Sequence, residues 1–241
     1  KIFNKLNMKI ILLSLDNEIG FQRRSLINYE YELFYGYDKL EDIPEDFIKK
    51  MHKMYNIKEK LFRAKVCHFY SYYMMLKKIV NEKLDNVIIC EDDAILDDPT
   101  YLRTDPKVLK ESLPDKFNTE EILILNCELH EPTNWEKNTK QYFKDNILPL
   151  INNFKEGINK IEYDKFRWSC TACMYYPKFQ NCIELINKID NAKKITTFDL
   201  WLSKNKLIKN LIFPSVFKIQ DNGVSQIQNS SGLIDNYQII K

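Results

Sequence analysis

The stretch from Asn86 to Leu96, N-V-I-I-C-E-D-D-A-I-L, most constrains how this chain can fold. Its apolar part, 87–90, is rich in β-branched residues and has no polar alternation, which is typical of a strand covered on both faces in a parallel α/β sheet. Three acids, Glu91, Asp92 and Asp93, follow the strand directly. Because side chains alternate along an extended segment, we expect Glu91 and Asp93 to point to one side and Asp92 to the other.

The three adjacent carboxylates indicate a cation-binding site. Ionised acids at a strand end repel one another, and two oxygen donors at positions i and i+2 form a natural half-site for a hard divalent ion such as Mg²⁺ or Mn²⁺. Such an ion completes its shell with water and with the phosphates of a bound substrate. The sequence therefore predicts a metal-assisted diphosphate site, and the alternative is an ordinary acidic turn that caps the next segment.

Composition limits the class of protein. A chain of 241 residues permits one large α/β domain or two small ones, and 44% hydrophobic residues suffice for a substantial core. No stretch reaches the roughly 18 apolar residues of a membrane span. The net charge of +2 comes from mixed acidic and basic residues, which argues against a dedicated nucleic-acid surface.

The six cysteines show no disulfide framework of the small secreted kind. The C-x-x-C of Cys170 and Cys173 has no second pair and no nearby histidine, so buried thiols are a better interpretation than a zinc site. We expect a reducing, cytoplasmic setting, with a membrane-peripheral position left open. The chain starts at Lys1 without a signal peptide, which is compatible with a trimmed N-terminus.

The first 40 residues predict a βαβ unit. A strand over 8–14, a polar loop over 15–20, a short helix reaching about Tyr29 and a strand over 31–35 follow in that order, with a right-handed crossover expected. Ligands of such sheets bind beyond the carboxyl ends of the strands. Arg23 and Arg24 lie near that edge, either as a solvated helix start or as contacts to phosphate or nucleotide.

The rest of the chain continues the α/β pattern. Apolar residues at helical spacing predict a long helix over about 58–84, which leads into the acidic strand. The polar stretch 130–157 is expected to be either a lid or binding loop, with Trp135 and Tyr142 as acceptor contacts, or a surface insertion. The remaining expected elements are helices over 46–54, 107–113 and from Pro177 to about 189, strands over 121–127, 167–176, 211–214 and 216–219, and a helix after Thr196 or Thr197 with Asp199 in its first turn.

In this order the motifs resemble glycosyltransferase family 25, which contains lipooligosaccharide and collagen hydroxylysine galactosyltransferases. The motifs that carry the resemblance are R-R at 23–24, an aromatic strand ending near Asp38, I-I-C-E-D-D-A at 88–94, an aromatic strand with a helix behind it over 172–189, F-D-x-W-L at 198–202 and the late P-x-x-x-K-I-Q-D-N-x-x-S-Q-I. Together they cover nearly the whole chain.

The resemblance implies a single GT-A domain over 1–241, with a Rossmann-like, mostly parallel sheet, a nucleotide-binding half over about 8–127 and an acceptor-binding half over about 128–241. It implies inverting transfer of galactose or glucose from a UDP-sugar to a hydroxyl of a glycan or a hydroxylysine-type protein, with Mn²⁺ or Mg²⁺ as cofactor. The site residues it implies are Glu91 and Asp93 for the metal, Asp199 as the base, Trp201 and Trp168 for the acceptor, and Leu15, Arg23, Arg24, Asp38, Asp92, Gln220 and Ser225 for the donor, with Asp92 facing the ribose or supporting its loop.

One departure concerns the Ser-His pair that the family carries about nineteen residues before the acids. That register holds Ser71-Tyr72 here, and Cys67-His68 lies four residues earlier. Either the histidine's role is absent or it is served from one helical turn away; a histidine packed against aromatic neighbours is the preferred interpretation of His68.

Two other classes of function stay open. A phosphohydrolase would need a nucleophilic Asp with a Thr or Ser and a Lys in set places, whereas Ala94, Ile95 and Leu96 follow Asp93. A carbohydrate-binding or scaffold domain that kept the fold and lost the chemistry would explain the missing Ser-His.

Overall fold

The computed structural model describes residues 8–51, 59–96, 119–130, 143–213 and 215–219. Its strands and helices follow in the order β1 (Lys9–Ser14), α1 (Glu18–Arg24), β2 (Glu32–Tyr35), η1 (Leu40–Asp42), α2 (Glu45–Lys50), α3 (Glu59–Asn81), β3 (Val87–Glu91), β4 (Ala94–Leu96), β5 (Leu123–His130), η3 (Phe143–Ile147), α7 (Leu148–Ile151), β6 (Gly157–Lys160), β7 (Arg167–Tyr176), α8 (Phe179–Asn191), α9 (Phe198–Lys204), β8 (Asn210–Phe213) and β9 (Phe217–Ile219).

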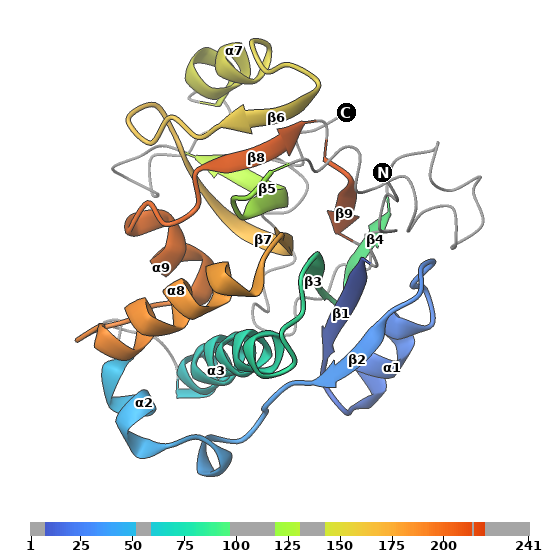
Figure 1. Cartoon of the computed structure of the whole chain (residues 1–241), viewed down its shortest axis with the longest axis vertical. Helices are drawn as coiled ribbons and strands as arrows, with labels where there is room; N and C mark the ends of the chain where they lie inside the picture. Colours follow the sequence, from blue (N-terminus) through green and yellow to red (C-terminus); the bar gives the residue numbers. More distant parts are fainter. Residues whose placement is uncertain (1–7, 52–58, 97–118, 131–142, 214, 220–241) are drawn as a thin grey trace, which may run out of the picture.

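Seven of the described strands form one sheet in the order β2-β1-β3-β7-β5-β8-β6 (Figure 1). The expected βαβ unit is present, because β1 pairs with β2 and with β3 in parallel. Five strands, β2, β1, β3, β5 and β8, run in the same direction, in agreement with a mostly parallel sheet. The exceptions are β7, which is antiparallel to both β3 and β5, and β6, which is antiparallel to β8. Three of these six pairings are parallel and three antiparallel, because β7 reverses the chain direction at the centre of the sheet.

Both faces of the sheet are covered, as the unbroken apolar run of β3 predicts. Val87 and Ile89 belong to a large core cluster with residues of α3, α8 and α9, and α3 and α8 lie side by side in Figure 1. Ile88 and Cys90 belong to a second cluster on the other face, with residues of β4 and β9. Alternate side chains of β3 therefore pack against different layers.

The segment that follows the acids forms part of a second, two-stranded sheet. β4 pairs with β9 antiparallel, with Ala94 opposite Ile219 and Leu96 opposite Phe217. The acids thus lie between β3 of the large sheet and β4 of the small one.

Other expectations need correction or lie outside the described residues. The stretch 130–157 is more regular than expected, because a π-helical turn (η3), α7 and the start of β6 fall within it. Trp135, Tyr142 and the expected helix over 107–113 lie outside the described residues. Among the helices of the described part, none has the length and apolar character needed to cross a membrane.

Candidate active site

The candidate site lies where β1, β2 and β3 end. Because these strands are parallel, Ser14, Tyr35 and Glu91 come to the same edge of the sheet. The backbone N–H of Gly36 donates to the Ser14 carbonyl at 2.8 Å, which holds the ends of β1 and β2 together.

Glu91 is held by two residues of α3. The Tyr72 hydroxyl donates to Glu91 Oε1 at 3.0 Å, and His68 Nε2 lies 2.9 Å from the same oxygen. Burial opposes ionisation of Glu91, but the charge and hydrogen bond of His68 and the Tyr72 hydroxyl outweigh it, and the pKa of Glu91 is lowered. Glu91 is therefore a carboxylate near neutral pH.

His68 has a polar role as well as an aromatic one. Its ring lies edge-on to Tyr72, with centroids 5.0 Å apart, in keeping with the expected packing against an aromatic neighbour. Burial disfavours the imidazolium, yet the charges of Glu91, Asp199 and Asp93 raise the pKa of His68 above its ordinary value. The structure thus brings a histidine to the acids from one turn before the Ser71-Tyr72 register.

Asp92 contacts α1 and β1, whereas Glu91 contacts α3. The strand ends at Glu91, and Asp93, like Asp92, lies within ion-pair distance of Arg23. Arg23 Nη1 donates to its Oδ1 at 3.0 Å and the Ser14 hydroxyl donates to its Oδ2 at 2.6 Å. The Arg23 and Asp92 side chains are each only 7% exposed. Burial, opposed by Ser14 and Arg23, leaves the pKa of Asp92 somewhat raised. Of the two roles expected for Asp92, this geometry favours support of the loop.

The two arginines of α1 have different surroundings. Arg23 is buried in its ion pair with Asp92, and its Nη1 also lies 3.6 Å from Asp93 Oδ2. Arg24 Nη1 donates to the Ser14 hydroxyl at 2.6 Å and to the Leu15 carbonyl at 2.9 Å. Its guanidinium lies 5.6 Å from the centroid of the Tyr35 ring. Arg24 thus holds the start of the loop after β1, and Arg23 holds the acids after β3.

Asp93 is the least satisfied of the three acids. Its Oδ1 is buried and has no hydrogen-bond partner in the described part of the chain. Burial and the neighbouring charge of Glu91 raise the pKa of Asp93 to about 7. A cation beside Glu91 and Asp93 would satisfy this oxygen and keep both acids ionised. Within the described residues, no group of three or more His, Cys, Asp or Glu side chains could hold a metal ion.

Asp199 lies in the first turn of α9, as predicted, and is partly buried. Its Oδ1 accepts from the Leu200 N–H at 2.8 Å. Thr197 is the N-cap residue, but its side chain makes no capping hydrogen bond. The charge of Asp199 contributes to the raised pKa of His68.

The remaining predicted residues are spread out. Trp201 is 6% exposed and packs against Phe69 of α3, with ring centroids 5.9 Å apart. Trp168 has no exposed surface, and its Nε1 donates to the Tyr163 hydroxyl at 3.0 Å. An acceptor role is not compatible with this core position, because a sugar could not reach the ring.

Leu15 and Asp38 follow β1 and β2 at the candidate edge; Leu15 is partly buried and Asp38 is exposed. Gln220 and Ser225 lie outside the described residues.

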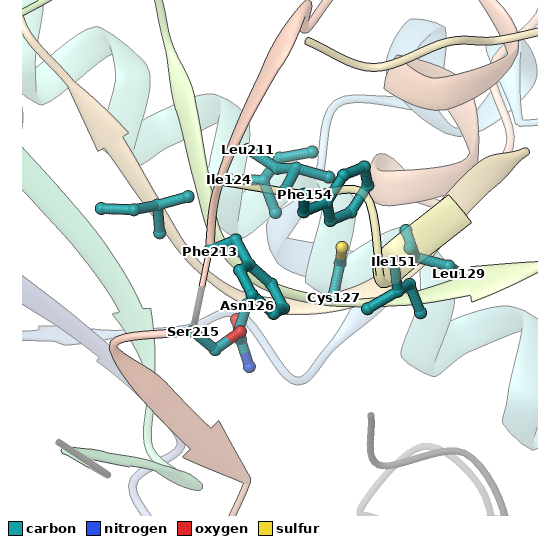
Figure 2. A pocket seen from close by; sticks show the side chains of 10 residues that line it. Ile124, Asn126, Cys127, Leu129, Ile151, Phe154, Leu211, Phe213 and Ser215 are labelled. Atoms are coloured by element: carbon teal, nitrogen blue, oxygen red, sulfur yellow. The ribbon is translucent and has the colours of Figure 1, made fainter. Parts of the chain in front are cut away.

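A small apolar pocket lies elsewhere, beside β5 and β8 (Figure 2). Asn126, at an irregularity of β5, lies at its rim, where its Oδ1 accepts the backbone N–H groups of Ala172 and Cys173. The other lining residues are Ile124, Cys127, Leu129, Ile151, Phe154, Leu211, Ile212, Phe213 and Ser215. None of the predicted site residues lines this pocket, so we do not assign the chemistry to it.

Fold and site together define an α/β protein with three acids at the carboxyl edge of its parallel strands. Comparison with known families identifies it further. The family model described as glycosyltransferase family 25 (LPS biosynthesis protein) matches residues 8–169, more than half of the chain. The chain therefore belongs to glycosyltransferase family 25, as its motifs predict. No curated protein matches it. Family membership makes it a glycosyltransferase, with a sugar donor and a glycan acceptor as its general partners.

Proposed function

We propose that this protein is an inverting, metal-dependent glycosyltransferase with a GT-A type fold. It moves a hexose, galactose or glucose, from a UDP-sugar to a hydroxyl of a glycan or of a hydroxylysine-type protein acceptor. One observation carries the proposal: two carboxylates lie at the end of β3 and just after it, of which Glu91 is held ionised, and Asp93 has a buried oxygen that no described residue hydrogen-bonds. Such a pair suits a divalent cation that also binds a diphosphate.

Glu91 and Asp93 would hold Mn²⁺ or Mg²⁺. The fit rests on the unsatisfied Oδ1 of Asp93 and on the all-oxygen donor set, which hard cations prefer. When bound, the ion neutralises charge that develops on the departing diphosphate. The protein's own contribution is to keep Glu91 ionised and to fix both acids at the sheet edge.

The donor nucleotide would lie along the ends of β1 and β2. Leu15, Arg24 and Asp38 border this edge, and Gln220 and Ser225 remain proposed contacts from the chain that follows β9. Because Arg23 is buried against Asp92, we assign both residues to support of the loop rather than to contact with the nucleotide. Open α/β sheets bind ligands at this edge, which supports the assignment.

Asp199 is the proposed catalytic base. Inverting transfer needs a group that takes the proton of the acceptor hydroxyl, and a carboxylate within hydrogen-bond reach can do so. Asp199 lies in the first turn of α9, and its charge contributes to the raised pKa of His68. Trp201, two residues later, is the proposed acceptor contact, through the small part of its ring that is exposed.

A non-catalytic scaffold is less well supported, because its main argument was the missing Ser-His pair. His68 reaches Glu91 from one turn earlier, so the acids keep a histidine partner. A phosphohydrolase gains no support either, since the chain enters β4 directly after Asp93.

The test is a screen of UDP-sugars with Mn²⁺, following UDP release with and without glycan acceptors. We expect release from at least one UDP-hexose, and loss of Mn²⁺-dependent UDP binding in Asp93→Ala. Glu45→Ala, which changes an exposed acid of α2, is the matched control. A folded protein that releases UDP from none of the donors would contradict the proposal, and unchanged UDP affinity in Asp93→Ala would contradict the metal assignment.

A further inference from the structure

One face of α3 contacts two parts of the candidate site that are far apart in sequence. Lys65, His68 and Tyr72 are spaced three and four residues apart, so their side chains lie on the same side of the helix. His68 and Tyr72 contact Glu91 at the end of β3. The charge of Asp199 in α9 acts to raise the pKa of both Lys65 and His68.

The contacts to Glu91 converge on one oxygen. The Tyr72 hydroxyl and His68 Nε2 both reach Oε1, at 3.0 and 2.9 Å, and no hydrogen bond from the described residues reaches Oε2. Two anchors on one oxygen fix the rotation of the carboxylate. Oε2 is therefore the oxygen left to face a cation.

Tyr72 is also in contact with α9 through its ring. It stacks on Phe198 with centroids 4.3 Å apart and ring planes 17° apart. Both side chains are almost fully buried, at 2% and 1% exposure, so neither ring has room to change its position. Phe198 is the first residue of α9 and directly precedes Asp199.

We infer that His68 and Tyr72 are positioning residues, which fix Glu91 through Oε1 and fix Asp199 through the stacking of Tyr72 on Phe198. A single helix face would then set the separation between the acid that holds the metal and the base that serves the acceptor. The inference rests on the proposed function and adds to it two residues that touch neither donor nor acceptor.

The two contacts of Tyr72 can be removed separately. Tyr72→Phe deletes the hydroxyl and keeps the ring, so we expect Mn²⁺-dependent UDP affinity to fall about 10- to 100-fold, as for other residues that orient a metal ligand. Phe198→Leu keeps the hydroxyl and removes the stacking. We expect its UDP affinity to match wild type and its kcat to fall about 10- to 100-fold, because misplacement of a catalytic group lowers turnover. His68→Ala should behave like Tyr72→Phe, and His68→Gln, whose amide can still donate, should recover part of the affinity.

Matched controls exist on α3 itself and on the neighbouring helix α2. Tyr73→Phe removes a 2.7 Å hydrogen bond to Asp190 of α8, and Phe47→Leu removes ring contacts of α2 with Phe69, Tyr70 and Tyr73. Both lower stability without touching Glu91 or Phe198, so UDP affinity and kcat should stay at wild-type values. Melting temperatures of all variants separate a general loss of stability from a change at the site.

UDP binding is measured by calorimetry with MnCl2, and turnover by UDP release. If the wild-type protein binds no UDP with Mn²⁺, the proposed function fails, and this inference fails with it. If wild type binds but Tyr72→Phe binds equally well, or if Phe198→Leu loses affinity and turnover together, the positioning role alone is overturned. Affinity loss in Tyr72→Phe with turnover loss alone in Phe198→Leu would establish it.

Discussion

The hydroxyl of Ser14 donates a 2.6 Å hydrogen bond to Oδ2 of Asp92, 78 residues later in the chain. Arg23 Nη1 donates a hydrogen bond to the other oxygen of the same carboxylate, Oδ1. Asp92 thereby joins the ends of β1 and β3 to α1, and its neighbours Glu91 and Asp93 owe their fixed positions in part to this buried contact. Four predictions follow from the surroundings of the site.

Asp92→Ala should lower the free energy of unfolding by up to about 3–5 kcal/mol, because it removes the nearer of the two carboxylates that face the buried Arg23 guanidinium. Ser14→Ala removes one hydrogen bond and should cost about 1 kcal/mol. Chemical denaturation measures both. Asp38→Ala, an exposed acid at the same edge, should change stability by no more than about 0.5 kcal/mol. Equal losses for Asp92→Ala and Asp38→Ala would show that Asp92 is not a structural anchor.

Gly20→Ala should destabilise the protein although alanine favours helices by about 1 kcal/mol over glycine. A Cβ at position 20 would lie 2.3 Å from the Leu15 carbonyl oxygen and 2.8 Å from the Ser14 hydroxyl oxygen. Helix α1 would have to move away from the loop that carries Arg24's hydrogen bonds. We expect a lower melting temperature and weaker UDP binding. A higher melting temperature in Gly20→Ala would contradict this expectation, because it would show that the loop after β1 can move aside without loss of stability.

The metal-free protein should lose stability as pH rises from about 4 to 7. The pKa of Asp93 is about 7 in the folded protein against 3.8 for an ordinary aspartate, so in this window the folded state keeps a proton that the unfolded chain has released. Mn²⁺ should stabilise the protein more at pH 8 than at pH 6, because the proton and the cation compete for the same carboxylate. Thermal denaturation with and without MnCl2 measures this, and Asp93→Asn should reduce both effects. A Mn²⁺ effect that is independent of pH would contradict this pKa.

Asp199→Asn should lower kcat by about 10²- to 10⁴-fold, the usual contribution of general base catalysis, with UDP affinity retained. Single-turnover rates and calorimetry give the two quantities. Asp190→Asn, which changes an acid of α8 bonded to Tyr73, serves as the control. Near-normal turnover in Asp199→Asn would remove it as the base.

The sequence predicts much of the fold, because hydrophobic periodicity reports burial. The runs around β1, β3 and β5 and the helical spacing of α3 and α8 all correspond to the elements expected. The direction of β7 does not follow from its sequence, since an apolar run has the same composition in parallel and antiparallel pairs. Its placement between β3 and β5 is decided by pairing across the whole sheet.

The site is predicted less completely, because hydrogen-bond partners depend on tertiary contacts. The acids are recognisable from their place after a buried strand. The partner of Arg23 cannot be recognised from the sequence, because a guanidinium binds a carboxylate of the protein and a phosphate of a ligand equally well. For His68 the sequence leaves two interpretations open, and the structure shows both aromatic packing and a contact to Glu91. Its position one helical turn before Tyr72 is the signal that it could face the same acid. The prediction for Trp168 is wrong, because an aromatic side chain suits a core as well as a sugar.

The position of β7 has a practical consequence for anyone who wishes to shorten this chain. The family match ends at residue 169, yet β7 pairs with β3 through residues 173–176, and β4 finds its partner only at 217–219. A fragment cut at the end of the match would leave β3 with a bare edge from Val87 to Cys90 and would omit α9 altogether. The matched segment, residues 8–169, therefore lacks strands that its own sheets need. Expression boundaries should be chosen from the strand pairing.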